Sequence, residues 1–265
     1  MEGKIFKLDP FVEAERRVQS GLSRLPPIVS HFLGYRSLEP LPSPTWMVCL
    51  WSFIGAFGGI GILFAVFDYH GFLLDEHSTP GIVASYGASA ILCYGAIDVP
   101  LAQPRALIFG HFLSALIGVI IQSIFKFSYY SLDSLNGGRK YDLQWLAGSL
   151  AVSIALVVMH LTKTTHPPAG ATALLPVLDP HMISRKWMFL PLVLVSSLLV
   201  LASALLVNNI QRRYPVFWIV PIPKSAQASR THDRDSTPSP DAAEVVHPPQ
   251  KEVGNGLGDL EAART

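Results

Sequence analysis

The sequence predicts an all-α protein that crosses a membrane several times, and three observations predict this class. Half of the 265 residues are hydrophobic, only 15% are charged, and the mean hydropathy is +0.37. The charges concentrate at the two ends of the chain, so that residues 46–222 hold only 16 of them, far below the roughly one in four of a soluble domain. Uncharged stretches in that section are long enough to cross the roughly 30 Å of a bilayer as helices.

The two ends of the chain are predicted to lie outside the membrane. Residues 1–45 contain no uninterrupted apolar run, and Asp9 followed by Pro10 is typical of a helix start. This helix is either a solvated segment before the membrane or an interfacial helix that lies on the bilayer. Residues 223–265 are rich in Ser, Pro, Asp, Ala and Gly and are predicted to be a disordered tail, which serves as a linker or carries phosphorylation sites.

The middle section, residues 46–222, is predicted to be a transmembrane domain of four full spans and two short, broken helices. The full spans are residues 46–67, 106–125, 144–161 and 188–208. Residues 81–97 and 167–178 are shorter and dense in Gly, Ala and Pro. Segments of this kind at membrane depth are expected where backbone is buried in protein or lines a cavity. Residues 167–178 either cross fully or form a re-entrant segment.

An internal repeat is predicted from the two short segments. GASAIL at residues 87–92 and GATALL at residues 170–175 share one pattern of small, hydroxyl and apolar residues, 83 positions apart. The order of span, short segment and span also recurs, which predicts two halves at about 46–125 and 144–208 in a 3+3 inverted arrangement. The alternative interpretation is close helix packing of small residues, and for Gly55 and Gly59 packing is the preferred one.

The positive residues predict on which side the termini lie. With six crossings, eleven Lys and Arg residues fall on the side of the termini and five on the other side. With five crossings, the Lys and Arg residues do not separate clearly between the two sides of the membrane. The positive-inside rule then predicts that both termini are cytoplasmic, or face the equivalent compartment, in an integral multi-pass protein of undetermined host membrane.

Three ordered blocks of sequence carry a resemblance to a known family. HPPAGATA at residues 166–173 resembles the signature of the HPP family of integral membrane proteins, and GASAIL, PLAQPR at 100–105 and GHFLSALIGV at 110–119 resemble its other conserved region. The resemblance runs from about Pro44 to Asn208. It implies a multi-span membrane fold and a transport role, and plastid relatives are associated with nitrite movement. The CBS domain of some bacterial relatives is not expected in the short, polar tail.

The two short segments predict a site for a small anion. Gly87 and Gly170 are each expected to begin a helix, whose first backbone N–H groups lack intrahelical partners and attract negative charge. Ser89 and Thr172 would add hydroxyl donors, and prolines before the second segment suit a helix start. The predicted substrate-binding residues are Gly87, Ala88, Ser89, Gln103, Arg105, His111, His166, Pro167, Pro168, Gly170, Ala171 and Thr172.

Ionisable and amide side chains near the spans are the other candidates. His166 is expected to bind the anion or carry a coupled proton, or else to remain neutral at a chain bend. Arg105 is either an electrostatic attractor at the cytoplasmic mouth or an interfacial anchor. Gln103 and His111 are expected to line the route, and His111 requires a polar partner within its span.

These features predict a transporter or channel for a small inorganic anion such as nitrite, with the lipid bilayer as its other partner. Transport of another small solute, and a non-transporting membrane scaffold, are the alternatives. We expect no enzyme, because no nucleophile and base or paired carboxylates occur in a span, and we expect no cofactor or metal. A net charge of +1 disfavours nucleic acid. A homo-oligomer is left open.

Overall fold

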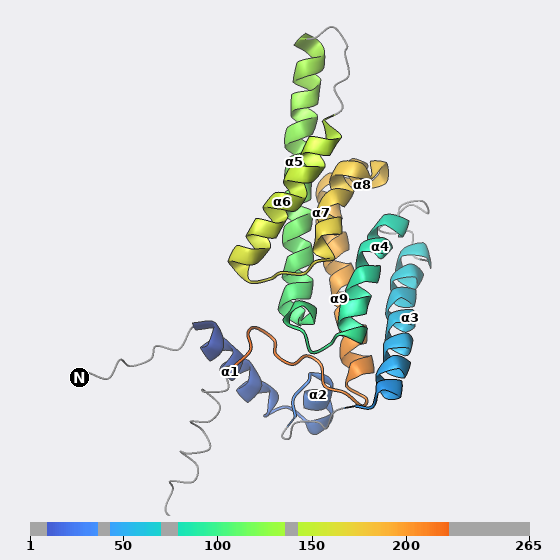
Figure 1. The fold of residues 1–265 in the computed structure, drawn as a ribbon, viewed down its shortest axis with the longest axis vertical. Coiled ribbons are helices and arrows are strands. Elements are labelled where there is room, and N and C mark those ends of the chain that lie inside the picture. Colours follow the sequence, from blue (N-terminus) through green and yellow to red (C-terminus); the bar gives the residue numbers. More distant parts are fainter. Residues whose placement is uncertain (1–9, 37–42, 70–78, 136–142, 223–265) are drawn as a thin grey trace, which may run out of the picture. The chain divides into compact units, whose positions relative to one another are not determined.

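The structure is a computed structural model that describes residues 10–36, 43–69, 79–135 and 143–222 (Figure 1). Every regular element in these ranges is a helix, which confirms the predicted all-α class. The predicted tail at 223–265 lies outside the described residues. The predicted N-terminal helix is present as α1 (Pro10–Leu22), which begins at Pro10 as expected.

Four helices are long and apolar enough to cross a bilayer, and they confirm the four predicted spans. They are α3 (Thr45–Tyr69), α5 (Pro104–Leu135), α6 (Gln144–Thr162) and α9 (Phe189–Asn208). Pro104 occupies the first position of α5, where a missing N–H is tolerated. Lys163 ends α6 in the left-handed conformation, with φ of 54°.

The other described helices are shorter. They are α2 (Pro27–Phe32), α4 (Thr79–Ala90), α7 (Ala169–Leu178) and α8 (Pro180–Arg185). One π-helical turn at Ile91–Gly95 follows α4, and short 3-10 turns lie at Pro100–Ala102 and Lys186–Met188. The expectation that Gly87 begins a helix is wrong, because α4 starts at Thr79 and Gly87 lies within it. No proline stands between Pro80 and Gly87 to interrupt the helix, so it continues through Gly87.

Helix α5 is the central helix, and it packs on α6, α7 and α9 (Figure 1). Two glycines on one face of α5 allow a close approach of the chain around α7. A Cβ at Gly118 would meet the Ala173 carbonyl and the Pro176 ring, and a Cβ at Gly110 would lie 2.7 Å from His166 Cβ. Close packing of this kind through small residues is common between membrane helices.

Helix α3 packs on α4 and α9 at the other side of the bundle. A Cβ at Gly55 or Gly59 would occupy the space of the Tyr94 ring, so the packing interpretation of this glycine pair is confirmed. The Tyr94 hydroxyl in turn contacts Ser203 Oγ of α9. Tyr94 therefore joins the π-helical turn to both α3 and α9.

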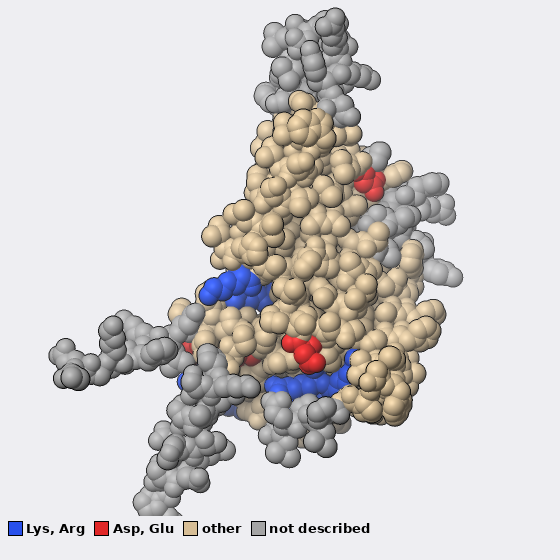
Figure 2. All heavy atoms as spheres, viewed as in Figure 1, with Lys and Arg blue, Asp and Glu red and all other residues tan. Residues whose placement is uncertain are grey.

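The two ends of the described chain meet at one end of the helix bundle. Helices α1 and α2 lie beside residues 209–222, which follow α9 (Figure 1). The Glu15 carboxylate of α1 is only 1% exposed and accepts hydrogen bonds from the backbone N–H groups of Trp218 and Ile219, the second at 2.7 Å. On the face shown in Figure 2, the Lys and Arg atoms gather over this end, and the helices farther from it show none.

The close approach at Gly118 yields a prediction for stability. We expect Gly118→Ala to lower the free energy of unfolding by about 1–3 kcal/mol, because the added methyl group must displace the backbone of α7. Gly58→Ala is the matched control, since nothing lies within 4 Å of the added Cβ. Thermal unfolding in detergent measures both variants. An unchanged transition for Gly118→Ala would contradict the α5–α7 packing.

Candidate functional site

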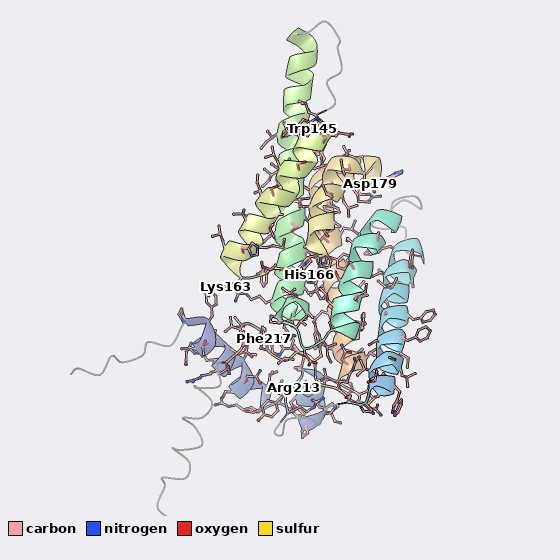
Figure 3. All side chains as sticks on the ribbon, viewed as in Figure 1. Trp145, Lys163, His166, Asp179, Arg213 and Phe217 are labelled. Carbon is pink, nitrogen blue, oxygen red and sulfur yellow. The ribbon has the colours of Figure 1, made fainter. Side chains whose placement is uncertain are left out.

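Two histidines and two hydroxyl residues form a fully buried polar cluster inside the helix bundle. His111 comes from α5, Ser89 from α4, Thr172 from α7, and His166 from the turn that precedes α7. Ser89 Oγ lies 2.8 Å from His111 Nε2 and 2.9 Å from His166 Nε2, and Thr172 Oγ1 lies 2.7 Å from His111 Nδ1. Figure 3 shows His166 inside the bundle, between Trp145 and Asp179 above and Phe217 and Arg213 below. The expectation that His111 finds a polar partner is confirmed.

The hydrogens of this cluster have one consistent arrangement when both imidazoles are neutral. His166 Nδ1 lies 2.8 Å from the Leu101 carbonyl oxygen, which can only accept, so Nδ1 carries the hydrogen and Nε2 accepts. Ser89 must therefore donate its hydroxyl hydrogen to His166 Nε2 and accept the Nε2–H of His111. His111 Nδ1 then accepts from the Thr172 hydroxyl. The four groups form a single chain in which each hydrogen points toward Leu101.

Tyr86 of α4 holds the His111 ring in place and was not among the predicted site residues. The two rings are stacked, with centroids 4.3 Å apart and an interplanar angle of 26°. The Tyr86 hydroxyl donates to the Val193 carbonyl of α9 at 2.7 Å. Tyr86 precedes Ser89 by three positions, so helical spacing alone places both on one face of α4. This three-residue spacing is the feature of the sequence that could have added Tyr86 to the predicted site.

The predicted pair of free helix N-termini does not occur. Gly87 lies within α4. At the start of α7, the backbone N–H groups of Ala169, Gly170 and Ala171 donate to the carbonyls of the residues three positions earlier, at 2.9–3.1 Å. These amides are already paired, so the anion cradle of backbone N–H groups is contradicted. The hydroxyls of Ser89 and Thr172 are likewise already paired, because Ser89 donates to His166 and Thr172 donates to His111.

Gln103 and Arg105, the other polar candidates, hold loops together. Gln103 is fully buried; its Nε2 donates to the Ile97 carbonyl at 2.8 Å, and its Oε1 accepts from Val216 N at 2.9 Å. Arg105 donates to the Thr162 carbonyl at 2.6 Å and lies over the Phe11 ring of α1. Both side chains thus tie the start of α5 to segments that are distant in sequence.

The small residues of the two motifs lie at the surface. Gly87 and Gly170 are half-buried, with nothing within 4 Å of a Cβ added at either, and Ala88 and Ala171 are exposed. Each pair directly precedes a buried hydroxyl residue of the cluster. Of the two prolines before α7, Pro167 is exposed and Pro168 is buried. The predicted site residues therefore divide into a buried polar cluster, a surface of small residues, and loop contacts.

The π-helical turn after α4 leaves carbonyls that side chains at and just after the end of α9 satisfy. Asn208 Nδ2 donates to the Cys93 carbonyl at 2.8 Å, and Arg212 Nη1 donates to the Tyr94 carbonyl at 3.0 Å. Burial lowers the pKa of the Arg212 guanidinium, and the Asp98 carboxylate partly offsets this. These contacts anchor the loop that leads to Leu101, and sequence reasoning did not find them.

Four apolar helices around a buried polar cluster define an integral, multi-pass membrane protein. Residues 41–215 match the family model described as "HPP, transmembrane region", and the chain belongs to this family. The resemblance seen at residues 166–173 is thereby confirmed.

Two relatives from Dictyostelium discoideum, both described as transmembrane proteins, are similar to this chain over more than half of its length. One is 40% identical over 172 residues, which is 63% of this chain and 50% of that protein. The other is 34% identical over 201 residues, which is 72% of this chain and 64% of that protein. The match thus leaves a substantial part of each relative uncovered. No solved structure matches the chain.

The contacts of Gln103 yield a second prediction. We expect Gln103→Leu to lower the free energy of unfolding by about 1–3 kcal/mol, because Val216 N–H and the Ile97 carbonyl lose their partner. Hydrogen exchange at Val216 and Phe217 should accelerate at the same time. Gln211→Leu is the matched control, since Gln211 is exposed and its side chain accepts a hydrogen bond from Trp51 Nε1 and not from a backbone N–H of this loop. Equal exchange in both variants would contradict the anchoring role.

Proposed function

We propose that this protein transports a small inorganic anion, such as nitrite, across its membrane, and that the buried cluster is the site of coupling. The observation that carries the proposal is a continuous series of hydrogen bonds in the interior of an apolar bundle, which joins Ser89, His111, His166 and Thr172. Polar and ionisable groups at such depth are costly and are usually retained for function. Family membership supports a membrane role and leaves the substrate to experiment.

We propose in addition that the chain is a 3+3 inverted repeat built on two short, interrupted helices. The pattern of helix contacts supports this. Helix α3 packs on α4 and α9, and α6 packs on α7 and α5, so exchange of the two halves preserves the contacts. Ser89 and Thr172, which correspond in the two motifs, both bond to His111. Transporters built in this way bind their substrates at the interface of the repeats.

The surface of small residues is the proposed approach to the cluster. Helices α4 and α7 contact each other, and each presents an exposed alanine, Ala88 and Ala171, next to its buried hydroxyl residue. Beside each alanine is a glycine, and a Cβ added at Gly87 or Gly170 would meet nothing within 4 Å. Each exposed alanine directly precedes a residue of the cluster in sequence, Ser89 or Thr172, so a small solute at this surface would lie next to the helix turns that carry them.

A second candidate function is transport of another small solute that is neutral or enters as a protonated acid. The absence of a charged partner favours it: among the described residues, the hydrogen bonds of the two imidazoles go to hydroxyls and to a backbone carbonyl. Such a cluster binds neutral hydrogen-bonding groups without a compensating charge. The two candidates differ in whether a permanently charged anion competes for transport.

The transport proposal is tested in liposomes that contain the purified full chain. We expect flux of nitrite above that of protein-free liposomes, and a smaller flux of nitrate and chloride. His166→Ala should lower the nitrite flux by about tenfold or more, because loss of a buried hydrogen-bonding group costs about 1–3 kcal/mol. The absence of flux for all three anions would overturn the proposal.

A cysteine placed at the proposed approach tests this route without the removal of a residue of the cluster. Ala171→Cys should transport like the wild type until a small thiol reagent modifies it, and modification should block flux. Ser153→Cys, at an exposed position of α6, should remain active after modification. Block of both variants, or of neither, would contradict the approach between α4 and α7.

The proposed topology has six crossings, with both termini on the cytoplasmic side. Exposed Arg24 lies at the end that holds α1 and α2, and exposed His181 lies on α8, beyond the opposite end of α7. In a chain whose exposed Cys49 is replaced, an impermeant maleimide should label Arg24→Cys and His181→Cys from opposite sides of the membrane. Labelling of both from one side would contradict six crossings.

A further inference from the structure

We propose that Thr172, His111, Ser89 and His166 form a proton relay that loads His166, so that each transported anion crosses together with one proton. This inference rests on the proposed transport function and specifies its second substrate. It follows from the direction of the hydrogen bonds, from the absence of a compensating positive charge beside the imidazoles in the described part of the chain, and from the position of the Leu101 carbonyl at the end of the hydrogen-bonded series.

The direction of the chain determines where an added proton comes to rest. A proton that arrives at Thr172 Oγ1 displaces the hydroxyl hydrogen to His111 Nδ1. The Nε2–H of His111 then moves to Ser89 Oγ, and the Ser89 hydroxyl hydrogen moves to His166 Nε2. Thr172, His111 and Ser89 each give up one hydrogen and receive one, and His166 only receives. His166 becomes an imidazolium, and the Leu101 carbonyl accepts its Nδ1–H throughout.

The loaded chain has the opposite polarity. His166 now donates through Nε2 to Ser89, Ser89 donates to His111 Nε2, and His111 donates through Nδ1 to Thr172. His111 stays neutral but exchanges one tautomer for the other. The reverse displacement restores the first arrangement when the proton leaves by Thr172. The relay therefore has two states that differ in the charge of His166 and in the tautomer of His111.

The surroundings of the two imidazoles explain why the anion requires this proton. From α4 the facing groups are Ser89 and the Tyr86 ring, from α7 Thr172, from the turn before α5 the Leu101 carbonyl, and each histidine faces the other. The neighbouring charged side chains are directed elsewhere. Arg105 donates to backbone carbonyls, Lys163 is exposed, and Asp98 is exposed and acts on Arg212.

An anion beside the neutral cluster would therefore be a buried charge without a counter-charge, which is strongly unfavourable. A proton on His166 supplies the counter-charge at the site itself. Entry of the pair leaves the net charge of the site unchanged. Transport is then electroneutral and driven by the pH gradient as well as by the anion gradient.

The coupling is measured in liposomes that contain a trapped pH indicator, with the membrane potential clamped at zero. We expect wild-type protein to acidify the interior by about one proton for each nitrite ion that enters, because one proton loads one His166. Ser89→Ala interrupts the chain between the two histidines and should lower this coupled flux by about tenfold or more. Ser89→Thr keeps the hydroxyl and should retain coupling.

Ser196→Ala is the matched control, since Ser196 is a fully buried serine of α9 whose hydroxyl donates only to the Leu192 carbonyl four residues earlier. It should transport with the coupling of the wild type. Nitrite entry by the wild type without internal acidification, or unchanged coupling in Ser89→Ala, would overturn the relay and leave the transport proposal standing. The absence of any anion flux would overturn both.

A spectroscopic measurement tests the relay without transport. In ¹⁵N-histidine NMR of the full chain in lipid, the two signals are assigned by their loss in His111→Asn and His166→Asn. We expect hydrogen on Nδ1 of His166 and on Nε2 of His111 at high pH. As His166 gains its second hydrogen at lower pH, neutral His111 should change to the Nδ1–H tautomer with the same midpoint. Independent changes, or the same tautomer for both residues at high pH, would overturn the relay.

Discussion

The hydrogen bond from His166 Nδ1 to the Leu101 carbonyl is the interaction on which the polar interior depends. It joins the turn before α7 to the turn before α5, and it fixes the tautomer of one histidine. The donors and acceptors of Ser89, His111 and Thr172 follow from that single choice. In an apolar environment each unmade bond would cost about 1–3 kcal/mol, so the four groups are stable only as a complete chain.

The backbone around this bond is arranged to bring the turns together. Gly110 has no side chain that would collide with His166. Gly118 likewise allows α7 to pack closely against α5. From the other side, Gln103 bonds to Val216, and the Tyr214 hydroxyl donates to the Ala102 carbonyl at 2.7 Å. The segment that contains Leu101 is thus held between the bundle and the chain that follows α9. The position of the Leu101 carbonyl is set by contacts from both halves of the protein.

The structure changes the chemical account of the site. A cradle of unpaired backbone amides would attract an anion without any proton, but the first amides of α7 are paired with carbonyls of the turn that contains Pro167 and Pro168. What remains at depth is a neutral chain with two titratable members. A neutral series of hydrogen-bonded groups favours an anion that enters together with a proton, because the proton compensates the negative charge. This is the physical link between the arrangement of Ser89 and Thr172 and the proposed joint movement of anion and proton.

The sequence by itself determined the class of the protein and the location of its spans. Hydropathy and length are properties of each segment alone, so the spans that became α3, α5, α6 and α9 were predictable without knowledge of their neighbours. The same holds for the start of α1, for the packing role of Gly55 and Gly59, and for the need of His111 for a polar partner. The family signature around His166 was equally local.

Only the tertiary structure decided which groups pair. Gly87 lies inside a helix because that helix starts earlier, at Thr79. Gln103 and Arg105 bond to segments that are distant in sequence, and Tyr86 meets His111 from another helix. The physical reason is that burial of apolar side chains is additive along a chain, whereas a hydrogen bond depends on the position and direction of a particular partner. The composition of the cluster was readable in the sequence, but the direction of its hydrogens required the fold.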